Sequence, residues 1–479
     1  MKNKIINSFS LILTFILFSS CSTNPSSGKK ELIIMSESEE DSIGKSEHPK
    51  IIKQFGGIYN NEKLQNYIES LGNFLVSTSE LPNKEFKFTV LNTPIINAFA
   101  LPGGYIYLTR GLIYLCQNEA QLAGVIAHEI GHITARHTAK RYTQTVGTSL
   151  LANILGVLAK NNAVGNLINQ SASLYLLSFS RSQEYEADLL ATRYMIRAGF
   201  DPKEMANFLK KMEEYSLLQR KILKSTKNNA ELLQTHPNSS KRVREVVSEI
   251  EEKIPLNPII GKEVFLKKID GMLFGYKPSN GFFYKNRFIH KPIGITFTFD
   301  KKFFFVNNPK FLLGLTNSDT KIFFDIDSKS ELDDLSYFSK WSKKSKNQIQ
   351  NFSSYRHNSF NISTAIISKK SKKIKLATIR NQKTIFRFAM ISNDSEFSSF
   401  EDSMDKTIKS FRKIDEDFEI SNFNPPKVRV LSQSVKEKSL KDIWQKNSLQ
   451  PKFSKEFFEV FNDIKKENDS YSEKIKMFY

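Results

Sequence analysis

Cysteine is almost missing from this sequence of 479 residues, which contains only Cys21 and Cys116. We expect no internal disulfide, because Cys21 is a candidate for lipidation and Cys116 lies among apolar neighbours, as a small core residue does. Long apolar runs are missing too. Phe9 to Phe18 and Val146 to Ala159 are both shorter than the roughly 20 residues of a membrane-spanning helix. We therefore expect the second run to be a buried or cleft-lining helix.

Acidic residues are too few to balance the basic ones. Lys and Arg number 70 against 50 Asp and Glu, which gives a net charge of +20. A basic surface favours anionic lipid headgroups or wall polymers as partners. Nucleic acid is the other usual partner of such a surface, but the export signal described next argues against it. Abundant Lys, Asn, Ile and Phe are also typical of AT-rich coding, so the charge carries little weight.

Residues 1–20 have the pattern of an export signal. Lys2 and Lys4 precede the apolar run, and two serines precede Cys21. This order predicts a bacterial lipoprotein signal peptide whose cleavage leaves Cys21 to carry the lipid, with Phe18 in place of the usual leucine. An uncleaved membrane anchor is the alternative. Residues 21–41 are polar at their start and are predicted to be a linker between lipid and domain.

Histidine is scarce, with seven residues in the chain, yet two of them occur in the HExxH pattern of His128 to His132. The surrounding segment, Glu119 to His137, has no proline and a helical spacing of apolar residues, so we predict one helix. His128 and His132 then lie one turn apart on the same side and are able to bind one Zn²⁺. Glu129 points to a metal-activated water rather than to the metal.

A third ligand is needed, and His137 does not supply it, because it lies about 180° round the predicted helix from His128. A second predicted helix, Ser180 to Phe200, carries Glu184 and Asp188 four residues apart on one face. A carboxylate from this helix would complete a His₂Glu set with an open fourth position, the catalytic pattern of zinc. Asp188 is then placed to hold a ligand histidine.

Two stretches near the HExxH pattern are predicted strands. Phe86 to Leu91 alternates apolar and polar residues, and Tyr105 to Thr109 is strand-like in composition, with a turn at Pro102–Gly104 before it. An exposed strand edge beside zinc would bind an extended peptide through main-chain hydrogen bonds.

The region from about Ser42 to Val246 resembles the HtpX/CAAX-protease family of zinc metallopeptidases, which are gluzincins with an HExxH…ExxxD pattern. Within that family it is most similar to the soluble, BepA-like branch of periplasmic lipoproteins, because membrane-embedded members have several long apolar spans. The matching segments are Asn97–Gly104, His128–His132, Glu184–Asp188 and Thr235–Pro237, followed by Arg242.

This resemblance implies one zinc ion per chain, bound by His128, His132 and Glu184. It implies that Glu129 is the general base and that Asp188 has a catalytic or orienting role. A loop histidine near the metal is also implied, and it is His236, as a plug on the fourth position or as a catalytic group. The substrate-binding residues that we assign from the matching segments are Asn97, Ala98, Gly103 and Gly104.

After Pro255 the sequence changes to short aromatic and β-branched runs separated by turn signals, which predicts an antiparallel sheet. A helix is predicted at Glu401 to Phe411. Residues 260–415 therefore resemble an α/β, PsbP-like accessory domain. Residues 425–479 are predicted as strand, helix, helix and strand, similar to a LysM peptidoglycan-binding module, with a generic helical tail as the alternative.

We therefore predict an α+β protein in which residues 42–255 form a mainly helical, zincin-type domain with a small sheet edging the cleft. The predicted function is a zinc-dependent endopeptidase of the bacterial cell envelope that hydrolyses peptide bonds of misfolded or misassembled envelope proteins. The alternative is an envelope chaperone or assembly factor with a largely latent zinc site. We expect a periplasm-facing lipoprotein of the outer membrane.

Overall fold

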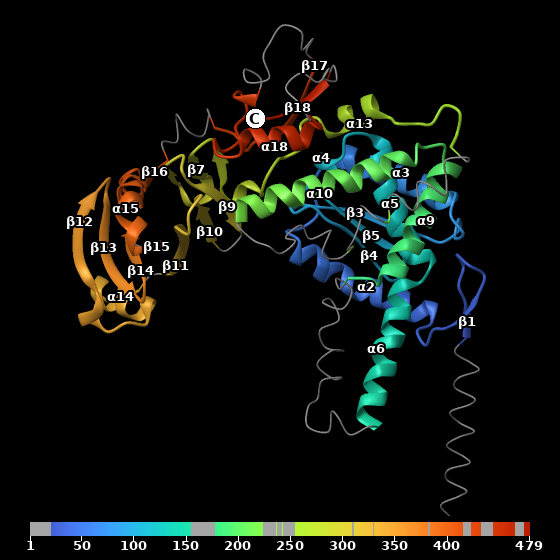
Figure 1. Cartoon of the computed structure of the whole chain (residues 1–479), viewed down its shortest axis with the longest axis horizontal. Coiled ribbons are helices and arrows are strands. Elements are labelled where there is room, and N and C mark those ends of the chain that lie inside the picture. Colours follow the sequence, from blue (N-terminus) through green and yellow to red (C-terminus); the bar gives the residue numbers. More distant parts are fainter. Residues whose placement is uncertain are drawn as a thin grey trace, which may run out of the picture. The chain divides into compact units, whose positions relative to one another are not determined.

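The computed structural model describes residues 21–154, 178–223, 236, 242, 254–308, 311–328, 330–381, 384–414, 423–432, 444–464 and 474–479. The chain divides into two compact units (Figure 1). The first comprises residues 1–220 and 226–269, and the second comprises residues 221–225 and 270–479. The predicted signal peptide, residues 1–20, lies outside the described residues.

A three-stranded sheet lies in the first unit in the order β3-β5-β4. Lys87 of β3 pairs in parallel with Tyr105 of β5, and Ala98 of β4 pairs antiparallel with Leu108 of β5. The strand predicted at Phe86 to Leu91 is confirmed as β3, but both of its faces are covered, because all of its residues after Lys87 are buried. A strand that is covered on both faces does not need polar residues on every second position. The strands are β3 (Lys87–Leu91), β4 (Ala98–Leu101) and β5 (Tyr105–Thr109).

Helices make up most of the rest of the first unit, as predicted. The helix α13, which lies within the predicted accessory domain, belongs to this unit and packs against α3 and α5. The helices are α2 (Glu37–Gln54), α3 (Glu62–Ser77), α4 (Arg110–Leu115), α5 (Glu119–Thr134), α6 (His137–Ile154), α9 (Arg181–Arg197), α10 (Lys203–Leu223, whose last three residues belong to the second unit) and α13 (Lys262–Ile269).

The segment predicted as a linker is folded. Residues 21–32 form a hairpin of β1 (Cys21–Thr23) and β2 (Lys30–Leu32), and α2 begins at Glu37. Ser36 caps α2 with a reciprocal bond to Glu39. The prediction failed because polar composition is common to flexible tethers and to tight turns with side-chain hydrogen bonds. Here Asn24 is fully buried.

The second unit contains a seven-stranded antiparallel sheet of order β12-β13-β14-β15-β11-β10-β9 and a four-stranded sheet of order β16-β8-β7-β6. The antiparallel sheet predicted here is confirmed. The strands are β6 (Phe282–Tyr284), β7 (Arg287–His290), β8 (Ile295–Thr298), β9 (Phe304–Asn308), β10 (Phe311–Leu315), β11 (Lys321–Ser328), β12 (Gln350–His357), β13 (Phe360–Lys369), β14 (Lys372–Arg380), β15 (Thr384–Asn393) and β16 (Arg412–Lys413).

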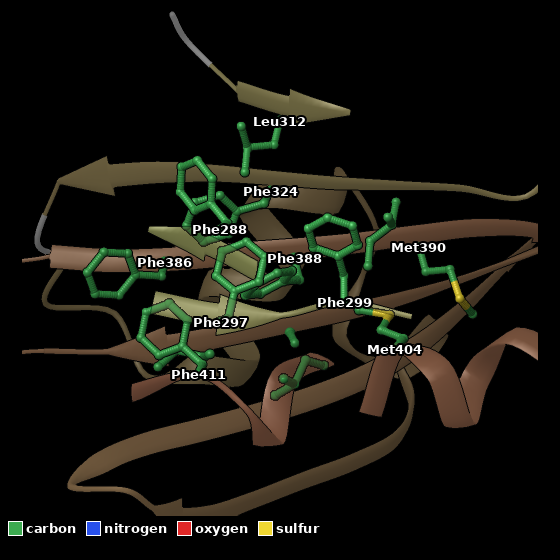
Figure 2. Close-up of a cluster of buried hydrophobic side chains, with 14 of the residues drawn as sticks. Phe288, Phe297, Phe299, Leu312, Phe324, Phe386, Phe388, Met390, Met404 and Phe411 are labelled. Atoms are coloured by element: carbon green, nitrogen blue, oxygen red, sulfur yellow. The ribbon is translucent and has the colours of Figure 1, made fainter. Parts of the chain in front are cut away.

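The strands of the large sheet alternate between two apolar clusters. Phe386 and Phe388 point into a phenylalanine-rich cluster, which Met404 of α15 (Asp394–Lys409) also joins (Figure 2). Ala389, on the opposite face, packs with Phe338 of α14 (Asp334–Ser342). The period of two along β15 thus buries both faces of the sheet under different helices. The helix predicted at residues 401–411 is the second half of α15.

The C-terminal segment belongs to the second unit. Strand β17 (Val428–Ser432) pairs antiparallel with β18 (Lys474–Phe478), and α18 (Ser454–Asn462) packs on them through Phe458. Most of the first predicted helix, residues 439–447, lies outside the described residues. The LysM-like module stays a prediction.

Among the described residues, every helix is too short or too polar to cross a membrane.

Candidate metal centre

Helix α5 carries the HExxH pattern in the interior of the first unit. Asn118 caps the helix by accepting a hydrogen bond from the Gln121 N–H. His128, Glu129 and His132 are all buried. The Nε2 atoms of the two histidines lie 3.0 Å apart. One helical turn therefore brings two imidazole nitrogens to the same point, as the sequence predicts.

The prediction of one helix from Glu119 to His137 is wrong. Helix α5 ends at Thr134, and a new helix begins at His137. Between them Arg136 has a φ of 52°, a left-handed conformation that an α-helix does not continue through. The Arg136 side chain donates a hydrogen bond to Met35 O and forms an ion pair with Glu40 across 3.2 Å, which holds this turn.

Helix α9 brings a carboxylate to the two histidines. The Oε2 of Glu184 lies 3.7 Å from His128 Nε2, and its Oε1 lies 3.5 Å from His132 Nε2. Gly131 makes this approach possible, since a Cβ there would lie 3.1 Å from the Ala187 carbonyl oxygen of α9. Ser180 and Gln183 cap α9 reciprocally and fix where Glu184 enters the first helical turn.

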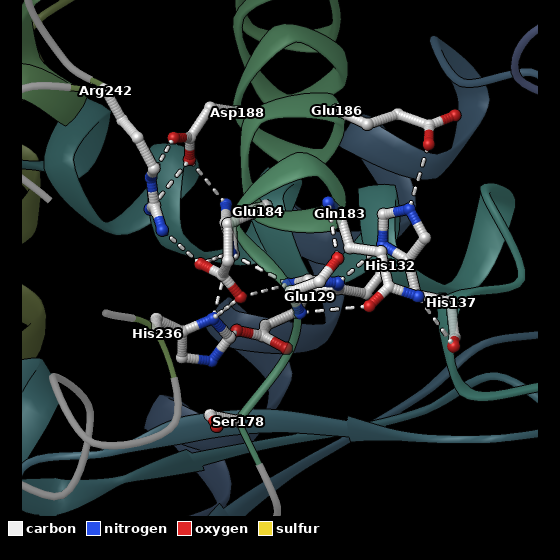
Figure 3. Close-up of polar contacts among 12 residues, drawn as sticks. Glu129, His132, His137, Ser178, Gln183, Glu184, Glu186, Asp188, His236 and Arg242 are labelled. Atoms are coloured by element: carbon white, nitrogen blue, oxygen red, sulfur yellow. Dashed lines mark hydrogen bonds and ion pairs between the residues drawn. The ribbon is translucent and has the colours of Figure 1, made fainter. Parts of the chain in front are cut away.

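A fourth side chain, His236, joins this group (Figure 3). Its Nδ1 lies 2.8 Å from Glu184 Oε1 and 3.2 Å from His128 Nε2. One donor atom from each of His128, His132, Glu184 and His236 lies within 4.8 Å of the others, and all four residues are buried.

This donor set fits zinc. Imidazole nitrogens and a carboxylate are its usual ligands, and bonds of about 2.0–2.2 Å in a tetrahedron place donor atoms a little over 3 Å apart. The separations of 3.0, 3.5 and 3.7 Å among His128, His132 and Glu184 agree with that spacing. The Oε2 of Glu129 is buried without a hydrogen-bond partner among the described residues. A carboxylate so placed suits a site that admits water.

Burial and mutual charge shift the pKa values of these groups in opposite directions. Burial would raise the pKa of Glu184, but the charge of His236 and the hydrogen bonds from His132 and His236 hold it well below its usual value. Burial raises the pKa of Glu129, although His236 and His128 oppose the rise. Burial lowers the pKa of His132 well below its usual value. A neutral imidazole and an ionised carboxylate are the forms that bind a metal.

Asp188 and Arg242 surround this group. Asp188 Oδ1 lies 2.8 Å from His128 Nδ1, the nitrogen opposite the one that faces the metal group. The Arg242 Nε–H donates to Asp188 Oδ2 at 2.7 Å, and the same guanidinium contacts Glu184. The structure thus brings Asp188 beside His128, as the sequence predicts, and places the buried Arg242 between the carboxylates of Glu184 and Asp188 (Figure 3).

Sequence reasoning missed the surroundings of His132. Phe179 stacks on its ring with centroids 4.0 Å apart, and His137 Nδ1 lies 2.8 Å from His132 Nδ1. His137 in turn contacts Glu186 of α9, whose pKa falls to about 2 chiefly because of that hydrogen bond. His137 lies outside the four-residue metal group, yet it does not point into solvent. Four of the seven histidines of the chain therefore gather here.

The residues assigned to substrate binding lie along β4 and the turn after it. Asn97 precedes β4 and Ala98 begins it, and this strand lies at the edge of the sheet. Gly103 and Gly104 have φ values of 79° and 89°, and a Cβ at Gly103 would lie 2.8 Å from the Asp41 Cα of α2. The turn is therefore packed against α2 at Gly103 and against the Glu85 carbonyl at Gly104, so the close packing and the positive φ values explain both glycines structurally. Gly103 also lines a cavity of about 130 Å³ whose lining includes His132.

The two cysteines have different positions. Cys21 begins β1, and its side chain lies outside what the structure describes. Cys116 is fully buried, as expected for a small core residue.

Comparison with known proteins agrees with this geometry. Residues 62–250 match the model of Peptidase family M48. The beta-barrel assembly-enhancing protease of Yersinia pestis is 35% identical over 189 residues, which are 38% of this chain and 37% of that protein. Its counterpart in Escherichia coli (strain K12) is 31% identical over 222 residues, 44% of each chain. The mitochondrial metalloendopeptidase OMA1 of Saccharomyces cerevisiae is 33% identical over 177 residues, 35% of this chain and 48% of that protein.

This chain thus spans less than half the length of these relatives. Among solved structures, cyanobacterial PsbP (CyanoP) from Synechocystis sp. PCC 6803 has 11% identity and a TM-score of 0.22, and covers 26% of this chain and 91% of that one. At that TM-score the likeness assigns neither fold nor function. The family match covers the segment that holds His128, His132, Glu184 and His236. The chain therefore carries a zinc metallopeptidase domain of peptidase family M48.

Proposed function

We propose that this chain is a zinc-dependent endopeptidase of the bacterial cell envelope. The observation that carries the proposal is the convergence of His128, His132 and Glu184 on one buried point, with the Glu129 carboxylate beside it. A zinc hydrolase needs protein ligands such as these imidazoles and this carboxylate, a general base, and access for water. Among the relatives, the name beta-barrel assembly-enhancing protease leads us to propose misfolded or misassembled envelope proteins as substrates.

The side chains divide the work as follows. His128, His132 and Glu184 would hold Zn²⁺, which when bound polarises the scissile carbonyl and acidifies a water at the site. Glu129 takes the proton of the attacking water and passes it to the leaving amine. Asp188 holds His128 by the nitrogen that faces away from the metal group.

The edge strand β4 would align the substrate. An extended peptide laid along β4 would add a strand to the sheet through main-chain hydrogen bonds. Asn97, Ala98, Gly103 and Gly104 would then lie along the bound peptide, and the cavity that Gly103 and His132 line would accept one of its side chains. Identification of proteins trapped by the full-length Glu129→Gln variant in cells tests the substrate class. A trapped set without envelope proteins would contradict it.

His236 is proposed as a plug on the fourth metal position. Its Nδ1 lies among the donor atoms of the metal group, so this nitrogen, once a metal ion displaces its proton, would take the place of the water that Glu129 has to activate. His236→Ala should therefore raise basal cleavage of a generic unfolded protein and increase self-cleavage. His357→Ala, in the second unit, is the control and should change neither.

The opposite result assigns His236 a different role. If this imidazole stabilises the oxyanion of the transition state, His236→Ala should lower turnover by roughly 10²-fold or more. A variant that equals the wild type in basal and in stimulated activity would contradict both roles.

A second candidate function is an envelope chaperone or assembly factor whose zinc site is largely latent. The position of His236 within the metal group favours it, because a plugged site binds substrates without cleaving them. The Glu129→Gln variant distinguishes the two functions in cells. Full complementation by Glu129→Gln would favour the chaperone, and failure to complement would favour the peptidase.

We propose that Cys21 carries a lipid that anchors the protein, facing the periplasm, in the outer membrane. The apolar run before Cys21 and the two serines beside it support this proposal. The wild type should be diacylated at Cys21 and should sediment with membranes, whereas Cys21→Ala should be neither lipidated nor membrane-bound. A Cys21→Ala protein that is processed and sediments like the wild type would show that the anchor lies elsewhere.

Residues 425–479 are proposed to bind peptidoglycan. Their two antiparallel strands and the helix α18 agree with part of the predicted order of elements. The full chain should co-sediment with purified peptidoglycan at moderate salt, and a chain that ends before residue 425 should not. Equal recovery of the two proteins would remove this proposal.

A further inference from the structure

A line of polar contacts runs from His132 to the N-terminal hairpin. His132 Nδ1 lies 2.8 Å from His137 Nδ1, and His137 Nε2 lies 3.1 Å from Glu186 Oε2. The other carboxylate oxygen of Glu186 accepts hydrogen bonds from Ser26 Oγ at 2.8 Å and from Asn24 Nδ2 at 3.3 Å. Figure 3 shows the inner part of this line, from Glu186 through His137 to His132.

Metal binding by His132 would give the hydrogen bonds along this line one donor-to-acceptor direction, from His132 toward Glu186. When the Nε2 of His132 binds a metal it offers its lone pair, so the ring proton then lies on Nδ1. That proton is donated to His137 Nδ1, which accepts it, so the proton of His137 lies on Nε2 and is donated to the Glu186 carboxylate. Each group thus fixes the tautomer of the next.

The two ligand histidines are therefore held in different ways. Asp188 of α9 contacts the Nδ1 of His128 directly. The Nδ1 of His132 instead faces His137, at the start of α6, and His137 contacts Glu186 of α9.

The carboxylate of Glu186 is itself oriented by residues of the hairpin. Asn24 is fully buried, and its amide also contacts Glu31. Lys140 lies 2.8 Å from Glu31 and 3.7 Å from Glu186, and so joins the hairpin to the same carboxylate. The hairpin therefore contacts Glu186 directly through Asn24 and Ser26. It also contacts Glu186 indirectly, because Lys140 lies between Glu31 of the hairpin and Glu186.

We propose that His137 and Glu186 are positioning residues for His132, and that the hairpin of residues 21–32 completes this support through Ser26 and Asn24. This rests on the proposed role of His132 as a zinc ligand. The docked hairpin holds the His132 ring in the orientation that binds the metal, and so raises zinc affinity. By linkage, bound zinc stabilises the docked hairpin to the same extent. The segment that follows the proposed lipid anchor is thereby coupled to the metal centre.

Zinc affinity of the full-length protein, measured by competition with a chromogenic chelator, tests the proposal. Outer-sphere partners of a ligand histidine typically contribute 10–100-fold in metal affinity, so Glu186→Gln should weaken zinc binding by about that factor. Ser26→Ala removes one of the hydrogen bonds to Glu186 and should weaken it by a few-fold. Ser27→Ala is the matched control, because Ser27 is the exposed neighbour in the same turn, and it should bind zinc like the wild type.

Hydrogen exchange gives a second readout that does not depend on activity. Zinc should slow exchange in residues 21–32 of the wild type and should slow it less in Ser26→Ala and Glu186→Gln. The thermal unfolding of each zinc-free variant, compared with the zinc-free wild type, separates lost positioning from lost folding. If Glu186→Gln does not fold, the zinc affinities of Ser26→Ala and Ser27→Ala are compared instead.

The outcomes separate this inference from the ligand assignment. If Glu184→Ala loses zinc while Ser26→Ala and Glu186→Gln bind zinc like the wild type, the positioning role is wrong and the metal site stands. If Glu184→Ala retains full zinc, the metal site itself is wrong.

Discussion

The Glu129→Gln protein is expected to bind zinc like the wild type and to lose nearly all peptidase activity. Glutamine keeps the size of the buried side chain but cannot accept the proton of the attacking water. Loss of a positioned general base typically costs 10²–10⁴-fold in rate, so turnover of an unfolded protein substrate should fall by about that factor.

The zinc content of the Glu129→Gln protein distinguishes loss of the general base from loss of the metal. Glu129 lies outside the four-residue donor group, so its replacement should leave about one zinc per chain. Glu213→Gln, at an exposed position of α10, is the control and should keep full activity. Activity within a few-fold of the wild type in zinc-loaded Glu129→Gln would exclude Glu129 as the base.

The second large effect is expected at Glu184. Its carboxylate is the only acidic donor in the metal group, and it also faces His236 and Arg242. Glu184→Ala leaves neutral donors alone at the site and removes the partner of a buried guanidinium. We expect zinc to fall from about one per chain to a small fraction after dialysis, and peptidase activity to fall with it.

Two controls are needed to attribute a loss of zinc in Glu184→Ala to the missing ligand. A strong chelator should inactivate the wild type, and added zinc should restore its activity. Glu213→Ala should retain full zinc, and circular dichroism of Glu184→Ala establishes whether the domain still folds. A folded Glu184→Ala protein with a full complement of zinc would show that Glu184 is not a ligand.

The sequence was sufficient to predict which site residues share a face when they lie within one helical turn of each other. His128 and His132 repeat with the period of a helix, and Glu184 and Asp188 do the same on a second helix. Local spacing therefore predicted which side chains share a face. The pairing of the two helices was predicted from zinc's need for a third ligand and was then implied by the family resemblance. No local pattern predicts that Gly131 of α5 packs against Ala187 of α9.

What the sequence did not predict depends on long-range contacts. Nothing in the sequence around Arg136 breaks a helix, since it contains neither glycine nor proline. The bend there is held by contacts with Met35 and Glu40, about a hundred residues earlier. Without that bend His137 would face away from the metal group, as we predicted.

The hairpin of residues 21–32 was missed for the same reason. Asn24 and Ser26 are typical of linkers, and their burial depends on Glu186, 160 residues or more along the chain. A polar turn becomes ordered when its hydrogen bonds have fixed partners, and composition does not reveal the partners.

The most direct test of the zinc site is a crystal structure of the full chain with anomalous diffraction data collected above and below the zinc absorption edge. We predict one anomalous peak per chain, within bonding distance of His128 Nε2, His132 Nε2 and the Glu184 carboxylate. A zinc-loaded crystal with no peak there, or with its peak on other residues, would contradict the proposed metal centre and with it the peptidase mechanism.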